Sequence, residues 1–254
     1  MKLAAFDLEI AKQAPADAGD LRRFAPLGIT CAAVAPGATA ELTVWQGFPQ
    51  LTRLECQGMV RELQALVQSG YTLVTWNGCA FDFWVLAQES GMLKECGELA
   101  LNHVDLMLMV TFTKGYYLGL DRALQGAGLK GKVKAVTLKD GTRISDMSGL
   151  RAPELWAAGE LEAVLEYLRG DASQLLELAE LAQRKKALTW RSNRGMPQSI
   201  SVKRLLPVTA CFDIPEPDVS WMDNPPTRQQ FVDWIPGWEK LTLISETKRT
   251  RSCR

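Results

Sequence analysis

The sequence predicts an α/β protein in which helices flank a mixed sheet of five or six strands. The first observation is that three short apolar segments, at residues 3–10, 28–34 and 41–45, follow one another with only short links, which favours antiparallel pairing. The second is that residues 53–67 carry apolar side chains at helical spacing and lead into another apolar segment at 71–76. Because a strand, a helix and a strand in this order are typical of a parallel crossover, the sheet should contain both kinds of pairing.

Helices account for most of the remaining chain. The apolar residues 104–110 are compatible with either a strand or a helix. Residues 130–142 contain several lysines and glycines and are expected to form an exposed loop or hairpin. The spacing of apolar residues predicts the other elements, which are a helix at 81–89, another at 118–127, a short one opened by Pro153 and the longest at 161–187.

The composition of the chain changes near Arg184. From Leu181 to Phe212 there is no acidic residue, and prolines and tryptophans are frequent from there to Trp238. We therefore expect one main domain over residues 1–185, an irregular extension over 186–238 that packs on it, and a disordered tail over 239–254.

Composition and charge exclude several classes of protein. The 254 residues contain 29 basic and 29 acidic side chains, and zero net charge argues against coating long duplex nucleic acid by bulk electrostatics. The six cysteines include no CxxC pair, which argues against a zinc site and fits a reducing compartment. With no secretory pattern at the N-terminus and no apolar run of membrane-spanning length, we expect a cytoplasmic protein without a membrane span.

Asp7 and Glu9 stand two residues apart in an otherwise apolar strand. Residues i and i+2 of a strand project to the same face, so the two carboxylates should lie side by side. Two buried carboxylates need compensation, which a divalent cation such as Mg²⁺ supplies through oxygen ligands. The alternative is that this strand lies at an edge of the sheet and both acids face water.

Two further motifs carry acidic side chains. Asp82 follows an apolar strand and falls in the first turn of the next helix, at the kind of junction where α/β sheets place ligands, although a helix dipole alone also favours an acid there. Tyr167 and Asp171 are four residues apart and should share one helical face, where they could bind a metal and orient a water. Taken alone, this pair also fits an ordinary amphipathic helix.

As an ordered set, the three motifs resemble those of a known family. The segment Phe6-Asp7-Leu8-Glu9, the pattern of Asn77 with Phe81-Asp82, and the pair Tyr167 and Asp171 match, in order and separation, the three motifs of the DEDD superfamily of 3′→5′ exonucleases. The tyrosine in the third motif indicates the tyrosine subtype. Over residues 1 to about 185 the chain is similar to the proofreading exonuclease domain of family-B DNA polymerases. The resemblance implies a ribonuclease H-like fold.

The resemblance also implies a mechanism. Two Mg²⁺ or Mn²⁺ ions, about 3.5–4 Å apart, clamp the attacking and leaving oxygens of the scissile phosphate. Asp7 would bridge both ions, Glu9 and Asp171 would complete the shell of the first, and Asp82 would hold the second. Tyr167 would orient the water that attacks. The implied reaction is hydrolysis at a free 3′ end, with single-stranded DNA favoured over RNA and a role in DNA repair through separate partners.

Other residues are candidates for contacts to the substrate. The resemblance implies that the backbone around Leu8 wedges against the terminal base and that Asn77 and Phe81 contact the terminal nucleotide by a hydrogen bond and by stacking. Arg191 and Arg194 lie in the basic stretch 184–204 and could follow the phosphate backbone, although a solvated basic segment is an equal alternative. An RNA exonuclease, a catalytically silent nucleic-acid-binding module and an endonuclease of ribonuclease H type remain as alternative functions.

Several residues outside the three motifs give weaker indications of their role. Asp105 is expected to support the site or to start a helix rather than to bind metal. His103, the only histidine, precedes the third motif and is interpreted as structural or as a minor contact to nucleic acid. Three lysines and three tryptophans complete the set: a solvated surface is expected for Lys130, Lys132 and Lys134, and packing is expected for Trp221, Trp234 and Trp238.

Overall fold

The computed structural model describes residues 1–15, 19–37 and 41–240. Most of the tail expected over residues 239–254 therefore lies outside the described residues. Within the described part of the chain, no helix combines the length and the apolar character needed to cross a bilayer.

The centre of the molecule is a five-stranded mixed sheet in the order β3-β2-β1-β4-β5. β2 pairs antiparallel with both β1 and β3, whereas β4 runs parallel to β1 and to β5. The strands are β1 (Lys2–Ile10), β2 (Ile29–Pro36), β3 (Thr43–Gln46), β4 (Tyr71–Thr75) and β5 (Val104–Asp105). The α/β class, the mixed sheet and the two kinds of pairing are thus confirmed.

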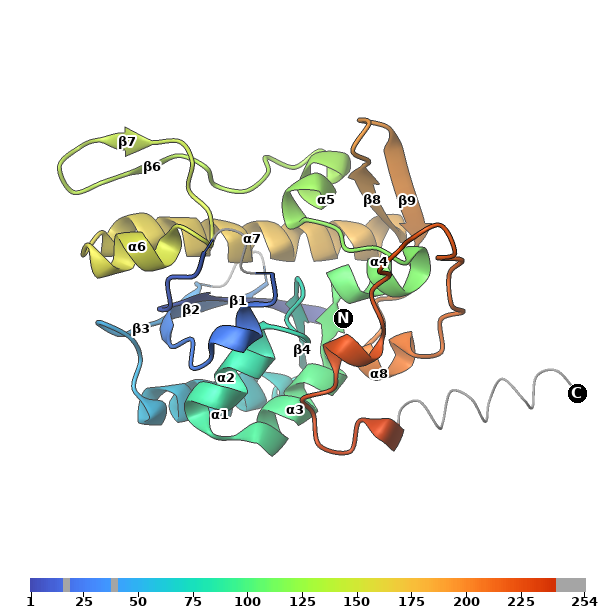
Figure 1. The fold of residues 1–254 in the computed structure, drawn as a ribbon, viewed down its shortest axis with the longest axis horizontal. Coiled ribbons are helices and arrows are strands. Elements are labelled where there is room, and N and C mark those ends of the chain that lie inside the picture. Colours follow the sequence, from blue (N-terminus) through green and yellow to red (C-terminus); the bar gives the residue numbers. More distant parts are fainter. Residues whose placement is uncertain (16–18, 38–40, 241–254) are drawn as a thin grey trace, which may run out of the picture.

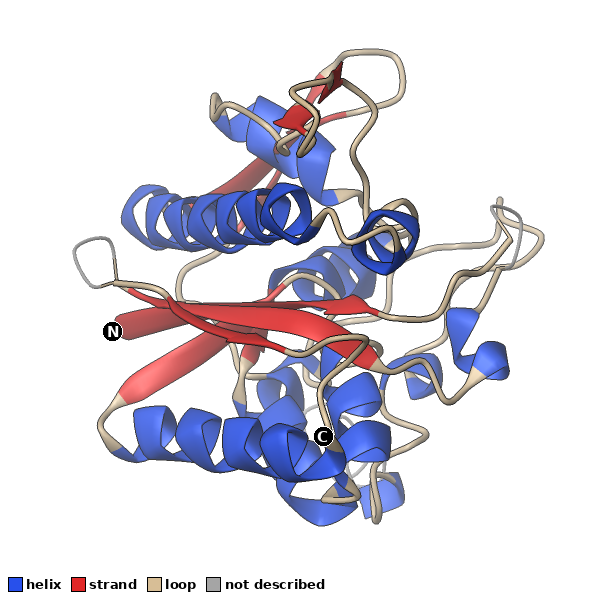
Figure 2. Ribbon diagram, turned by 90° about the vertical axis from the view of Figure 1, so that its left-hand side faces the viewer, coloured by secondary structure: helices blue, strands red, loops and turns tan. Residues whose placement is uncertain are grey.

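Helices cover both faces of this sheet, as Figure 2 shows with the sheet seen nearly edge-on between two helical layers. One layer holds α1 (Arg53–Gln68), α2 (Asp82–Ser90) and α3 (Leu93–Asn102), and the other holds α5 (Leu120–Ala127), α6 (Ala152–Ala157) and α7 (Leu161–Lys185) (Figure 1). The remaining described helices are α4 (Leu106–Lys114) and α8 (Val208–Cys211), with short 3₁₀ turns at Leu21–Phe24 and Gln229–Phe231.

Local sequence explains where the first helix begins and why it packs. Thr52 and Glu55 form a capping box, since each side chain accepts a hydrogen bond from the other residue's backbone amide. Further along, Cys56, Met59 and Leu63 recur at helical spacing and are fully buried. This stripe fixes the face that α1 turns toward the sheet.

The central strand is apolar on both faces because helices cover both. Leu3 to Phe6 are at most 3% exposed, and α7 packs across β1 and β2. An edge strand with acids facing water, the alternative for Asp7 and Glu9, is excluded because β1 is the middle strand of the five.

One helix and one hairpin were not expected, and two segments that the sequence left open are resolved. α3 was not expected, and residues 104–110 divide into the two-residue β5 and the start of α4 because the Asp105 carboxylate accepts a hydrogen bond from the Leu108 amide and so caps the helix. The basic stretch after α7 is an antiparallel hairpin formed by β8 (Ala187–Arg191) and β9 (Pro197–Ser201). A smaller hairpin, β6 (Val136–Thr137) with β7 (Arg143–Ile144), occupies the segment expected to be a loop or hairpin.

Candidate active site

The predicted site residues gather at the carboxyl ends of the parallel strands β1 and β4. β1 carries Asp7 and Glu9 in its second half, and α7 crosses the same strand with Tyr167 and Asp171 one turn apart. A cavity of about 350 Å³ lies between these elements. All five residues predicted to be catalytic line this cavity, namely Asp7, Glu9, Asp82, Tyr167 and Asp171.

A tight turn after β4 places Asp82. Asn77 adopts a left-handed conformation, with φ at 71°, which asparagine tolerates better than most residues. The Phe81 amide then donates to the Asn77 carbonyl at 3.0 Å, and Asp82 becomes the first residue of α2. The turn therefore points a helix-terminal carboxylate into the cavity from the side opposite α7.

The Asp105 carboxylate fixes the backbone of this turn by hydrogen bonds. Its two carboxylate oxygens accept hydrogen bonds from the backbone amides of Asn77 and Cys79, each at 3.0 Å. Burial raises the pKa of Asp105 to about 6, and the backbone amides oppose the shift. Asp105 is buried and does not line the cavity. Its contacts agree with the expectation of a supporting or helix-starting residue.

His103 also stabilises the backbone of this turn, through Thr75. Nδ1 lies 2.7 Å from the Ala100 carbonyl, which can only accept, so the proton is on Nδ1 and Nε2 accepts from the Thr75 hydroxyl at 2.8 Å. The Thr75 oxygen in turn accepts from the Gly78 amide. Burial lowers the pKa of His103 to about 4, so the ring is neutral at neutral pH. With 2% of its surface exposed, His103 is structural and cannot contact nucleic acid.

The carboxylates of the cavity act on one another electrostatically. Burial raises the pKa of Asp7 to about 7, with a further contribution from Asp171. Burial and the neighbouring Asp7 also raise the pKa values of Glu9 and Asp82 well above their usual range. A site of this kind is costly to ionise without a cation, which is the property expected of carboxylates that hold a metal.

Lys132 supplies a cation inside the cavity, so the expectation of a solvated side chain is wrong for this residue, whereas Lys130 and Lys134 are exposed as expected. Its Nζ lies 2.5 Å from Oδ2 of Asp171 and 5.0 Å from the ring centre of Tyr167. The side chain is 29% exposed, and its charge lowers the pKa values of Asp7 and Glu9 against the effect of burial. Lys132 is thus a charged residue of the cavity that the sequence did not indicate.

Contacts outside the cavity hold the lysine loop in place. Asp121 on α5 accepts hydrogen bonds from the Lys132 amide at 3.1 Å and from Nζ of Lys134 at 2.7 Å. Val133 packs against Gly170 of α7, where a Cβ atom would come within 2.3 Å of the valine Cγ2. Gly170 therefore lets the loop approach the helix next to Asp171. A glycine in the middle of a long helix was the one sequence signal for this contact.

The donor set fits a divalent cation. Oδ1 of Asp171 is buried and has no hydrogen-bond partner among the described residues, which leaves an oxygen that a cation would satisfy. In the described part of the chain, no group of three or more acidic, cysteine or histidine side chains is arranged as a ready-made metal cage. Mg²⁺ does not need such a cage, since one or two carboxylates, waters and substrate phosphate oxygens suffice.

Tyr167 remains a phenol under all ordinary conditions. Burial and the nearby carboxylates Glu9 and Asp171 raise its pKa above the normal value. The side chain is 1% exposed and borders the cavity one turn from Asp171. Tyr167 can therefore donate or accept a hydrogen bond in the cavity, but it cannot act as an anionic base.

The residues predicted to bind nucleic acid fall into two groups. Leu8, Asn77 and Phe81 line the cavity beside the carboxylates. Arg191 and Arg194 do not reach it and instead line a separate cavity of about 410 Å³ at the tip of the β8–β9 hairpin.

Two of the three tryptophans expected to pack do so, and one does not. Trp234 donates from Nε1 to the Cys79 carbonyl at 2.8 Å, and Trp238 is partly buried against the core, so both pack as expected. Trp221 is 67% exposed, and the expectation of a packing role is wrong there.

Comparison with known proteins identifies the superfamily to which this chain belongs. Residues 31–183 match the family model described as RNase_H superfamily, and the chain belongs to this superfamily. Among solved structures, the chain is similar to the family B DNA polymerase from the hyperthermophilic archaeon Pyrobaculum calidifontis, with 18% identity and a TM-score of 0.51. That match covers 71% of this chain and only 24% of the polymerase, and it shows a shared fold. No curated protein matches the sequence.

Proposed function

We propose that this protein is a metal-dependent 3′→5′ exonuclease. The observation that carries the proposal is the convergence of four carboxylates and a phenol, from β1, α2 and α7, on one cavity of an RNase H-like fold. The order of the motifs and their resemblance to the tyrosine subtype of DEDD exonucleases support the same reading. Membership of the superfamily supports nuclease activity, and nucleases of this superfamily generally use divalent metal ions.

Asp7, Glu9, Asp82 and Asp171 would hold the cations. When bound, divalent ions supply a more acidic water and stabilise the negative charge that develops on the phosphate. Asp7 is central to the proposal because its charge contributes to the raised pKa values of both Glu9 and Asp82. Asp171, with its unpartnered Oδ1, is suited to hold a cation on the side of α7.

Tyr167 and Lys132 provide the remaining polar groups. The phenol positions a water molecule by hydrogen bonding, since its raised pKa excludes a role as an anionic base. The ammonium group of Lys132 borders the cavity opposite Phe81, where it attracts a phosphate group. On substrate binding, Lys132 exchanges its contact with Asp171 for a contact with phosphate, and the carboxylate is then free for a cation.

Leu8, Asn77 and Phe81 form the contact surface for the last nucleotide. Phe81 is partly exposed and borders the cavity, so a base can stack against its ring. Leu8 lies between the two β1 carboxylates in the sequence and lines the same cavity, where it contacts the terminal nucleotide. An unpaired 3′ end fits this arrangement, and single-stranded DNA is the preferred substrate of the proposal.

The test uses single-stranded DNA and RNA of one sequence, each labelled at the 5′ end and incubated with Mn²⁺. We expect a ladder of products that shortens from the 3′ end, and faster shortening of DNA. Asp7→Asn should lower the rate by roughly 10³-fold or more because several kcal/mol of transition-state stabilisation depend on the bound cations. Glu62→Gln, which removes the charge of an exposed acid on α1, is the matched control and should retain full activity.

Two outcomes would contradict the proposal. Intact substrates with both metals and both sugars would indicate a nucleic-acid-binding module instead. Cutting of a circular single strand, which has no end, would indicate an endonuclease.

A further inference from the structure

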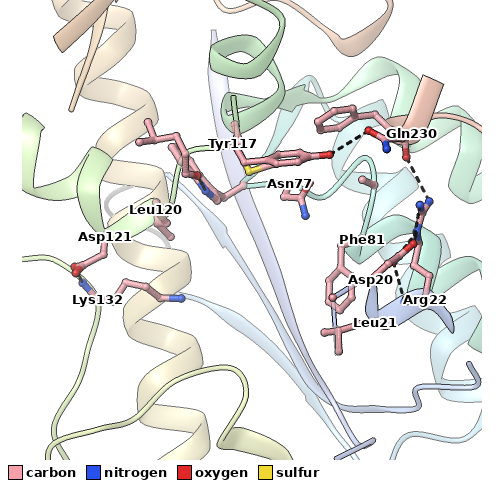
Figure 3. A pocket seen from close by; sticks show the side chains of 17 residues that line it. Asp20, Leu21, Arg22, Asn77, Phe81, Tyr117, Leu120, Asp121, Lys132 and Gln230 are labelled. Carbon is pink, nitrogen blue, oxygen red and sulfur yellow. Dashed lines mark hydrogen bonds and ion pairs between the residues drawn. The ribbon is translucent and has the colours of Figure 1, made fainter. Parts of the chain in front are cut away.

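Three neighbouring cavities form a continuous surface that begins at the carboxylates. The active-site cavity shares Asn77, Phe81 and Lys132 with a larger middle cavity of about 830 Å³. Figure 3 shows this middle cavity, with Lys132 on one side and Phe81 on the other. The middle cavity in turn shares Tyr117 and Leu118 with the outer cavity at the β8–β9 hairpin. A groove therefore leads from the site of chemistry to the hairpin.

The outer cavity combines positive charge with exposed aromatic rings. Arg122, Arg191 and Arg194 line it, and none of the described residues around it is acidic. Tyr117 and Trp221, which are 55% and 67% exposed, lie on the same surface. Cations that follow a backbone and open aromatic faces on which bases stack are the two features that bind single-stranded nucleic acid without sequence preference.

The described residues that line the middle cavity include two acidic and two basic side chains. Its two acidic residues both have basic partners, since Asp20 pairs with Arg22 at 3.1 Å and Asp121 pairs with Lys134 at 2.7 Å. A polyanion that passes through the groove therefore meets acidic side chains that already have basic partners until it reaches the carboxylates, where cations would be bound.

The hairpin is fixed against the main body. Thr189 of β8 donates to the Gly126 carbonyl of α5 at 3.0 Å, and a Cβ atom on Gly126 would come within 2.1 Å of the Trp190 Cα. Trp190 itself is 1% exposed. α5 and the hairpin lie side by side in Figure 1, so Arg191 and Arg194 project from a docked element.

The segment that carries Trp221 is also held in place. Gly115 ends α4 with φ at 82°, and a Cβ atom there would come within 2.2 Å of the Val219 Cγ1. The Met222 amide donates to the Val219 carbonyl at 2.9 Å and closes a turn around the tryptophan. The large exposed ring of Trp221 is thus presented by an ordered turn beside the arginines.

We infer that this groove binds the single strand upstream of its 3′ end. The inference rests on the proposed function: the terminal nucleotide lies at the carboxylates, the preceding nucleotides cross the middle cavity, and the strand leaves over the hairpin between Trp221 and the arginines. The hairpin and the Trp221 turn lie outside residues 31–183, the region that matches the superfamily model, whereas Tyr117 and Arg122 of the outer cavity lie within it.

Binding of labelled oligothymidylates and oligouridylates, from a dinucleotide upward, tests the inference by fluorescence anisotropy in EDTA. Affinity should rise with length until the hairpin is reached. Trp221→Ala should weaken binding of the long oligonucleotides by about tenfold and leave the dinucleotide unaffected, because only the longer strand reaches the ring. The double variant Arg191→Gln/Arg194→Gln should reduce the slope of log affinity against log salt by about 1.4, as expected for two lost contacts to a single strand.

The matched control is Arg61→Gln/Lys94→Gln, which removes two exposed charges from α1 and α3 and should leave both quantities unchanged. The inference is overturned if the groove variants bind the long oligonucleotides as the wild type does. Loss of dinucleotide binding to the same degree, or equal competition by polyglutamate, would also overturn it, since neither result requires bases in the outer site.

Activity on the same series separates this inference from the proposed function. Wild-type hydrolysis should slow once the strand is too short to reach the hairpin, and the groove variants should lose this dependence on length. Length-dependent binding without hydrolysis would support the groove and contradict the exonuclease. Hydrolysis whose rate is the same at every length, in wild type and variants, would support the exonuclease and overturn the groove.

Discussion

Lys132 keeps a positive charge next to the buried Asp171 carboxylate, and this contact offsets part of the cost of burying the acidic cavity. Burying a carboxylate without a partner costs several kcal/mol, and Nζ at 2.5 Å removes much of that cost. The neighbouring Asp105 and His103 act differently. They bind backbone and hydroxyl groups below the turn and fix the position of Asp82.

The neutral His103 predicts a specific dependence of stability on pH. Its pKa is about 4 in the folded protein and near 6.5 in an unfolded chain, so the unfolded state binds the proton first. The contribution of His103 to stability is therefore complete above about pH 6.5 and is lost as the pH falls toward 4, by up to about 3 kcal/mol.

His103→Gln isolates this contribution. At about pH 7.5 the variant should be less stable by about 1–2 kcal/mol, because the bonds to Thr75 and Ala100 are weakened. By about pH 5 the two proteins should be about equally stable. The unfolded wild type then binds a proton at His103, which favours unfolding, whereas glutamine does not titrate. Urea unfolding of both proteins at the two pH values measures the difference between their free energies of unfolding. The carboxylates are the same in both proteins, so their contributions cancel in this difference. A gap that widens in acid would contradict the assignment of a neutral ring.

At the scale of elements, the contact between α5 and β8 attaches the C-terminal hairpin to the RNase H-like body. Gly126 lies against the Trp190 backbone, so the two elements approach more closely than any side chain at residue 126 would allow. The hairpin gains its own pairing from five residue pairs and buries Leu188 and Trp190 against the body.

Two glycine substitutions should have opposite effects on stability. Gly126→Ala should lower the free energy of unfolding by roughly 1–3 kcal/mol, because the new Cβ overlaps backbone that cannot move without releasing the hairpin. Gly58→Ala should raise it by up to about 1 kcal/mol, since a Cβ at this helical position in α1 meets nothing within 4 Å and alanine favours the helix. Urea midpoints of the two variants and the wild type provide the comparison. Equal effects of the two changes would contradict the close approach of α5 and β8.

At the scale of the whole molecule, the carboxylates of the cavity lower the stability of the metal-free protein. The net charge of the chain is zero, yet four carboxylates line one cavity in which Lys132 forms an ion pair with Asp171. Binding of a cation to these carboxylates should therefore stabilise the folded protein.

Asp7→Asn should therefore make the metal-free protein more stable. The folded pKa of Asp7 is about 7 against 3.8 unfolded, so its contribution is favourable below about pH 4 and is lost as the pH rises through 7. In EDTA at about pH 8, ionised Asp7 costs up to about 4 kcal/mol, and asparagine removes that cost.

Thermal unfolding in EDTA and in Mn²⁺ measures this effect. We expect a higher Tm for the variant in EDTA at about pH 8, little difference at about pH 4, and a larger gain in Tm on adding Mn²⁺ for the wild type than for Asp7→Asn. A wild type at least as stable as the variant in EDTA at about pH 8 would show that the buried carboxylates are not under electrostatic strain.

The sequence by itself determined the α/β class, the mixed sheet and the helices that cover it, because apolar periodicity and short links are local properties of the chain. It also indicated the residues that line the cavity, since two acids in an apolar strand and a tyrosine four residues before an acid are local patterns. The α3 helix was missed because its start at Leu93 has no side-chain cap, and the β8–β9 hairpin because basic residues hide the alternation of Leu188 and Trp190.

Only the tertiary structure decided which charged residues meet. Lys132 and Asp171 are far apart in the chain, and nothing local distinguishes Lys132 from the solvated Lys134 two residues later. The packing of Val133 on Gly170 and the hold of Asp121 on the loop select one lysine for the cavity. The same holds for Trp221, which lies with Arg191 and Arg194 because the C-terminal segment folds back over α4. Such contacts depend on the free energy of the whole packing arrangement, which no short segment of sequence contains.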